Sequence, residues 1–147
     1  MEVMIVTAII GVGSAMAVPA YLQWVARYEL RQATTELASN LTLARMAAKN
    51  RNAPVAVALA VITCPPATND CGRVSVASGA LAAPTVLPGK ITGFTGGPVQ
   101  FTPLGLLVGG ANQVISIQAQ TSSGVVSYST VVMPSGKVSW CAMATCP

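Results

Sequence analysis

The sequence predicts an α+β fold in which a long N-terminal α-helix, first hydrophobic and then amphipathic, packs on a C-terminal antiparallel β-sheet. Two observations predict it. No charged residue lies between Val3 and Ala26, and apolar residues then recur at helical spacing as far as Asn52. After Pro54 the chain consists of short runs rich in valine, isoleucine and threonine, separated by glycine and proline. We expect three parts: a hydrophobic helix segment at 1–26, an amphipathic half at 27–53 and a sheet domain at 54–147.

The composition argues against an enzyme. Hydrophobic residues make up 52% of the 147 residues and charged residues only 8%, with a mean hydropathy of +0.61. A soluble domain is about a quarter charged, and a disordered chain needs low hydrophobicity. Histidine is absent, which removes the commonest general base, the usual nucleophile pairs and most zinc or haem ligation. We expect no catalytic residue, no cofactor and no metal, since the carboxylates are few and far apart in sequence: Glu2, Glu29, Glu36 and Asp70.

The N-terminal segment is predicted to cross a membrane as a helix. Val3 to Leu22 is uncharged, and about 20 such residues span a bilayer as a helix. Arg27 and Arg31 follow, and three aromatic residues lie at the same end, where an aromatic belt would form: Tyr21, Trp24 and Tyr28. The alternative is a cleaved secretory signal, but no positive charge precedes the apolar run and no clear small-residue cleavage site follows it.

Four residues of this segment are candidates for helix-to-helix assembly. A carboxylate inside lipid is costly, and we interpret Glu2 either as a harmless interfacial residue or as a group that finds a positive partner when helices pack. Gly11 and Gly13 would let helix backbones approach closely. With Pro19 they are poor helix-interior residues, so we expect the stretch from Gly11 to Pro19 to unwind where helices pack outside lipid.

The amphipathic half carries one apolar stripe and several cations. The stripe repeats every three or four residues: Leu30, Ala33, Leu37, Leu41, Ala44 and Ala48. The opposite face carries Arg31, Gln32, Glu36, Asn40 and Lys49. Basic residues cluster between Arg27 and Arg51, and they form either a solvated face favoured by the helix dipole or a surface for nucleic acid or anionic lipid. Pro54 predicts that the helix ends near Asn52.

The remainder predicts antiparallel strands joined by short turns. The expected strands are Val55–Thr63, Arg73–Ser78, Val99–Thr102, Val114–Gln120, Val125–Met133 and Lys137–Cys141. Ser122–Gly124 and Pro134–Gly136 read as hairpin loops. The stretch from Gly79 to Pro98, rich in alanine, glycine and proline, is predicted to be an irregular surface loop.

The four cysteines predict an oxidising compartment. They fall into two close pairs, Cys64 with Cys71 and Cys141 with Cys146, although three pairings are possible. Their spacing does not match the usual zinc motifs. Two local disulfides are the simplest interpretation, and long-range pairing or four reduced thiols are the alternatives. Disulfides would place this part of the chain in the periplasm or at the cell surface.

Several motifs resemble one known superfamily. Residues 2–21, EVMIVTAIIGVGSAMAVPAY, resemble the N-terminal segment of type IV pilins and type II secretion pseudopilins. Other segments resemble the GspH/FimT-type branch of this superfamily. They are residues 30–45, 49–55, 99–105 (VQFTPLG) and 134–141 (PSGKVSWC), together with Cys64-Pro65 and Cys71. Together these segments cover most of the chain.

This resemblance implies a non-catalytic structural subunit. Such subunits sit in the bacterial inner membrane, lose a short leader to a prepilin peptidase, and are extracted by an assembly platform into a pilus or a periplasmic secretion pseudopilus, where they contact copies of themselves or other pilins. The family glutamate, matched by Glu2, neutralises the amino terminus of the adjacent subunit, and the family proline, matched by Pro19, lies where filament helices unwind. Family members carry a few residues before this glutamate, whereas here it follows Met1 directly.

A second function implied by the branch is DNA binding for uptake in natural transformation. Members with that role tend to carry an arginine-rich turn near the C-terminus. The matching turn here, residues 136–139, has one cation, Lys137. Candidate DNA contacts are therefore Lys137, Arg73 and Lys90.

Overall fold

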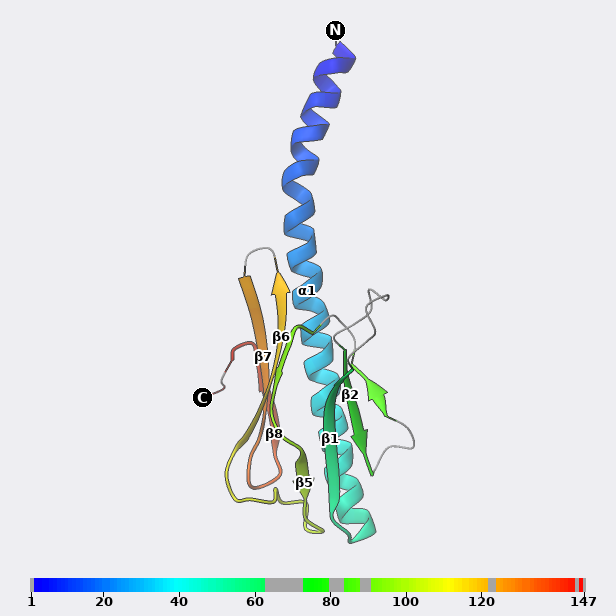
Figure 1. Ribbon diagram of the computed structural model, residues 1–147, viewed down its shortest axis with the longest axis vertical. Coiled ribbons are helices and arrows are strands. Elements are labelled where there is room, and N and C mark those ends of the chain that lie inside the picture. The colour runs from blue at the N-terminus through cyan, green and yellow to red at the C-terminus, as the bar shows by residue number, and fades with distance from the viewer. Residues whose placement is uncertain are drawn as a thin grey trace.

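The computed structural model describes residues 2–62, 73–79, 84–87, 91–121, 124–144 and 146, and it confirms the α+β fold. One continuous helix, α1 (Glu2–Arg51), precedes all the strands. Figure 1 shows that α1 runs the length of the molecule, with its second half beside the sheets and its first half projecting beyond them.

The strands form two four-stranded sheets rather than the single sheet predicted. The first has the order β3 (Thr85–Val86), β2 (Arg73–Ser78), β1 (Val55–Ile62) and β5 (Val99–Phe101). The second has the order β4 (Gly93–Thr95), β6 (Gln113–Thr121), β7 (Gly124–Val132) and β8 (Val138–Cys141). All described pairings are antiparallel, and α1 contacts strands of both sheets.

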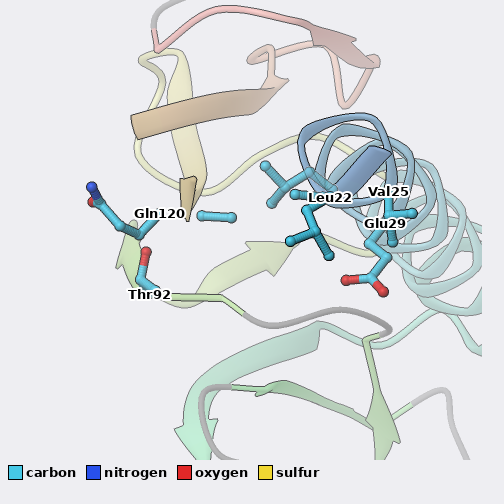
Figure 2. A pocket seen from close by; sticks show the side chains of 8 residues that line it. Leu22, Val25, Glu29, Thr92 and Gln120 are labelled. Carbon is cyan, nitrogen blue, oxygen red and sulfur yellow. The ribbon is translucent and has the colours of Figure 1, made fainter. Parts of the chain in front are cut away.

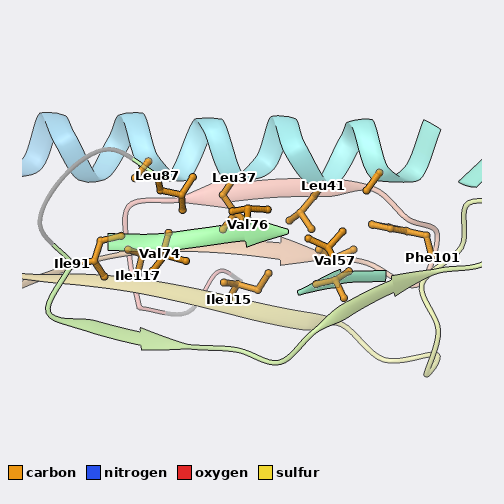
Figure 3. Close-up of a cluster of buried hydrophobic side chains, with 14 of the residues drawn as sticks. Leu37, Leu41, Val57, Val74, Val76, Leu87, Ile91, Phe101, Ile115 and Ile117 are labelled. Atoms are coloured by element: carbon orange, nitrogen blue, oxygen red, sulfur yellow. The ribbon is translucent and has the colours of Figure 1, made fainter. Parts of the chain in front are cut away.

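The predicted apolar stripe of α1 is the helix side of the core. Leu30 is 2% exposed, and Ala33, Leu37, Leu41, Ala44 and Ala48 are fully buried. Figure 3 shows Leu37 and Leu41 pointing from the helix toward side chains of both sheets. These include Val57, Val74, Phe101, Ile115 and Ile117, all 0% exposed. The second half of α1 is therefore held by burial of this stripe.

One polar residue assigned to the solvated face lies inside. Asn40 is 7% exposed, and its Nδ2 has no hydrogen-bond partner among the described residues. It follows Leu37 by three residues and precedes Ala44 by four, so it borders the buried stripe rather than opposing it. The assignment of Asn40 to solvent was wrong for this reason.

The end of α1 is set by local sequence. Asn52 adopts a left-handed conformation with φ of 48°. Its N–H donates to the carbonyl of Lys49 at 3.3 Å, and the N–H of Ala53 donates to the carbonyl of Ala48 at 3.2 Å. This pair of bonds satisfies two helix-end carbonyls, and Pro54 follows where the helix cannot continue. The predicted end near Asn52 is confirmed.

The prediction of an irregular surface loop from Gly79 to Pro98 was wrong. This segment contributes β3 and β4, and its Leu87 and Ile91 are 0% and 3% exposed. The N–H of Leu87 donates to the carbonyl of Val74 at 2.9 Å. Both strands are very short, so no alternating pattern was long enough to predict them.

Replacing Leu87 with alanine tests this correction. We expect the free energy of unfolding to fall by about 2–5 kcal/mol, because a fully buried leucine would leave a cavity. Val86→Ala, at a neighbouring side chain that is 42% exposed, is the matched control. Urea denaturation measures both; a loss below about 0.5 kcal/mol for Leu87→Ala would restore the surface-loop interpretation.

Candidate assembly surface

The first half of α1 is an exposed apolar surface. We call residues 2–26 the apolar rod; none of its described side chains is buried. Its large apolar side chains are 55% to 76% exposed at Val3, Met4, Ile5, Val6, Ile10, Val12, Tyr21, Leu22 and Trp24. Exposed apolar side chains in this number, among those described, mark an interaction site.

The predicted assembly residues lie along this rod. The helix continues without a break through Gly11, Gly13 and Pro19. A Cβ at Gly11 or at Gly13 would meet nothing within 4 Å, so both positions are open to a neighbouring helix. Glu2 begins α1, but the side chains of Glu2 and Pro19 lie outside the described residues. Unwinding between packed helices therefore stays a prediction.

Within the part of the chain that the structure describes, no helix combines the length and hydropathy expected of a membrane span.

Stacked aromatic rings lie where the rod meets the sheet domain. The ring centroids of Tyr21 and Trp24 are 6.3 Å apart, and those of Trp24 and Tyr28 are 5.9 Å apart and nearly parallel. These residues are three and four positions apart, so they share one face of the helix. All three side chains are 59% to 63% exposed.

The second sheet extends this aromatic face. The guanidinium of Arg31 lies 5.8 Å from the ring centroid of Trp140 on β8, and Trp140 lies 6.4 Å from Tyr128 on β7. No local sequence pattern places Trp140 here, because its position is set by pairing between β7 and β8. We call Trp24, Arg27, Tyr28 and Arg31 the basic side of α1.

A hollow of about 330 Å³ lies on another side of the same helix turns. Leu22, Val25, Ala26, Glu29 and Leu30 line it from α1, and Thr92, Ala119 and Gln120 line it from the sheet domain. Figure 2 shows Leu22 and Val25 at the hollow with the Glu29 carboxylate beside them, across from Thr92 and Gln120. We call it the acidic hollow; no sequence pattern pointed to it.

The basic residues near the end of α1 serve the fold. Arg45 donates from Nε to the carbonyl of Gly105 at 3.0 Å and from Nη2 to the carbonyl of Ser135 at 2.9 Å. Arg51 donates from Nη1 to the carbonyl of Gly79 at 2.6 Å. Arg45 and Arg51 therefore hold the end of α1 to loops of the sheet domain. The choice between a solvated face and a surface for nucleic acid or anionic lipid stays a prediction.

The candidate DNA contacts are only partly described. Lys137 is exposed in the turn between β7 and β8, and Arg73 begins β2, although its side chain lies outside the described residues. Lys90 lies outside them entirely. DNA binding stays a prediction.

One disulfide closes the C-terminal loop. Cys141 and Cys146 are bonded, with Cα atoms 5.8 Å apart. The loop lies against β7, where the Ser129 hydroxyl donates to the carbonyl of Ala144 at 2.6 Å. A loop this short contributes about 2.2 kcal/mol in the chain-entropy model. Cys64 and Cys71 lie outside the described residues, as does their predicted disulfide.

Among the described side chains, no three His, Cys, Asp or Glu residues are grouped as a metal site requires.

Comparison with known proteins gives two similar solved structures. No protein-family model and no curated protein matches the chain. The first structure is the type IV minor pilin FimU of Pseudomonas aeruginosa, 22% identical, covering 79% of this chain and 90% of its own, with a TM-score of 0.49. The second is FimU in another crystal form, 22% identical, covering 76% and 92%, with a TM-score of 0.47.

Proposed function

We propose that the chain is a structural subunit that assembles through its apolar rod into a helical filament, with copies of itself or with other subunits of the same kind. The observation that carries this proposal is the rod itself, which projects from the sheet domain with its large apolar side chains exposed (Figure 1). The resemblance of residues 2–21 to type IV pilins and pseudopilins implies the same function.

Burial of apolar area supplies the driving force for assembly. Each Å² removed from water contributes about 25 cal/mol, and the rod offers a surface on every side of the helix. The open positions at Gly11 and Gly13 would allow neighbouring rods to approach closely. The sheet domain, packed on the second half of α1, would then lie outside the bundle of rods.

Before assembly the rod needs another apolar environment, and a lipid bilayer is the one we propose. The subunit would be held in the inner membrane, processed by a prepilin peptidase and transferred by an assembly platform to a filament in the periplasm or outside the cell. Fractionation of cells tests this step. Recovery in the membrane fraction after washing with high salt is expected, and recovery in the soluble fraction would contradict it.

Glu2 would set the axial register between neighbouring subunits of the filament. A carboxylate carried into a bundle of apolar helices must be paired, and the amino terminus of a neighbouring copy supplies the opposite charge. Glu2→Val is expected to leave membrane association unchanged and to reduce incorporation into filaments at least tenfold. Immunoblots of membrane and sheared surface fractions measure the two quantities; an unchanged filament yield would remove the register role.

Electron microscopy of sheared or membrane-extracted material tests the function as a whole. Filaments whose peptides map to this chain are expected. A full chain that stays monomeric and soluble without detergent would contradict the proposal, because nothing would then cover the rod.

A further inference from the structure

The charges of α1 near the sheet domain are sorted onto opposite sides. Glu29 stands two residues after Arg27 and two before Arg31, and residues at this spacing do not face each other on a helix. Glu36 lies seven residues after Glu29 and so shares its side. One side of α1 therefore carries acids and the other carries arginines, and Glu29 lies at the same level as Arg27 and Arg31.

These charges find no ionic partner within the described chain. No ion pair is formed by Arg27, Glu29 or Glu36 with any residue that the structure describes, and Glu29 and Glu36 are only half-buried. Arg31 lies over Trp140, but Arg27 remains exposed beside the start of β7. Opposite charges on opposite sides of one helix can meet only between two molecules.

The apolar features of the two sides are also complementary. The acidic hollow offers Leu22, Val25 and Ala26 beside the carboxylate of Glu29 (Figure 2). The basic side offers Trp24 and Tyr28 next to Arg27, and these two aromatic side chains are 63% and 59% exposed. Interface cores favour tryptophan, tyrosine and arginine in this way, since they combine large apolar area with a polar end.

We infer that the basic side of α1 in one copy docks onto the acidic hollow of the next copy, with Arg27 pairing with Glu29. This inference rests on the proposed function and names the lateral contact that accompanies packing of the rods. A contact between two different surfaces is head-to-tail, and repetition of a head-to-tail contact gives a ring or an open helical filament rather than a closed dimer. The contact is also continuous with the apolar rod, which ends at the same helix turns.

Exchange of the two charges tests the pairing. The full chain is purified in a mild non-ionic detergent, which covers the rod, and self-association is measured by sedimentation velocity at low and moderate salt. We expect the wild type to associate, and more weakly as salt rises. Arg27→Glu and Glu29→Arg should each raise the dissociation constant at least about tenfold, which corresponds to about 1.4 kcal/mol. The double variant should restore the wild-type value.

Lys137→Glu is the matched control, because it makes the same charge change at an exposed cation outside both surfaces; it should leave association unchanged. Single reversals without effect, a double variant that stays weak, or a wild type that is monomeric in detergent would each overturn the inference. None of these outcomes would contradict the proposed function, because filament formation through the rods is measured separately by electron microscopy.

Discussion

Val12→Lys is expected to lower filament yield by about a hundredfold while the sheet domain stays folded. Val12 lies in the rod, is 64% exposed and is far from the core that holds the sheets. A lysine near the centre of an apolar helix costs roughly 2.5–3.5 kcal/mol in lipid, which would reduce entry of the subunit into the bilayer from which it assembles. A bundle of apolar helices offers the lysine no better partner, so assembly would not recover this cost. Since each 1.4 kcal/mol is a factor of about ten, a cost of this size corresponds to the expected loss of about a hundredfold.

Val108→Lys is the matched control for this prediction. Val108 is 48% exposed on the sheet domain, where a lysine can reach water. Sheared filaments should be quantified for both variants, and thermal unfolding of the purified proteins should show the same midpoint. A Val12→Lys chain that assembles as well as the wild type would mean that the rod is not the assembly surface.

The helix was predictable because its signal is local and repeated. The six stripe residues of α1 recur over five turns, and the same six are buried at 0% to 2%. The longer strands, such as β6 and β7, alternate or carry β-branched residues over nine positions and were also predicted. In both cases the pattern predicts which side chains face the core, and this prediction does not depend on which other elements form that core.

Non-local pairing was not predictable from the same signals. The division into two sheets depends on β1 pairing with β5 and β4 pairing with β6. The hydrogen bonds of Arg45 reach carbonyls 60 and 90 residues away. Hydrophobic periodicity describes the face of one element and contains no information on its partners.

Only the part of the candidate site that lies on one helix was predictable, because its residues are close in sequence. The apolar rod and the stacked aromatic residues Tyr21, Trp24 and Tyr28 follow from neighbouring positions on one helix. The contact of Trp140 with Arg31 and the acidic hollow need the second sheet in place. The sequence therefore predicted an apolar surface on the helix, and the structure shows the hollow and the aromatic contact beside it.

The two C-terminal motifs that carry the branch resemblance contact one another in the fold. Gly105 follows β5 in residues 99–105, and Gly136 lies in the turn of residues 134–141. The N–H of Leu107, two residues after the first motif, donates to the carbonyl of Pro134 at 3.0 Å. Arg45 donates to a carbonyl in each motif. A Cβ at Gly136 would clash with the carbonyl oxygen of Gly105 and lie 2.7 Å from Nε of Arg45. Only glycine fits this contact.

Gly136→Ala is therefore expected to lower the free energy of unfolding by about 4 kcal/mol or more. Gly136 has a φ of 74°, and an alanine there costs roughly 1–2 kcal/mol in backbone strain. Relief of the clash must move the turn and break both Arg45 hydrogen bonds, each worth about 1.5–3 kcal/mol because the donor is charged. Gly110→Ala separates these terms, since Gly110 has a φ of 70° and open space around it. It should lose only the strain. Urea denaturation in mild detergent compares the two, and equal losses would show that the contact between the motifs does not stabilise the fold.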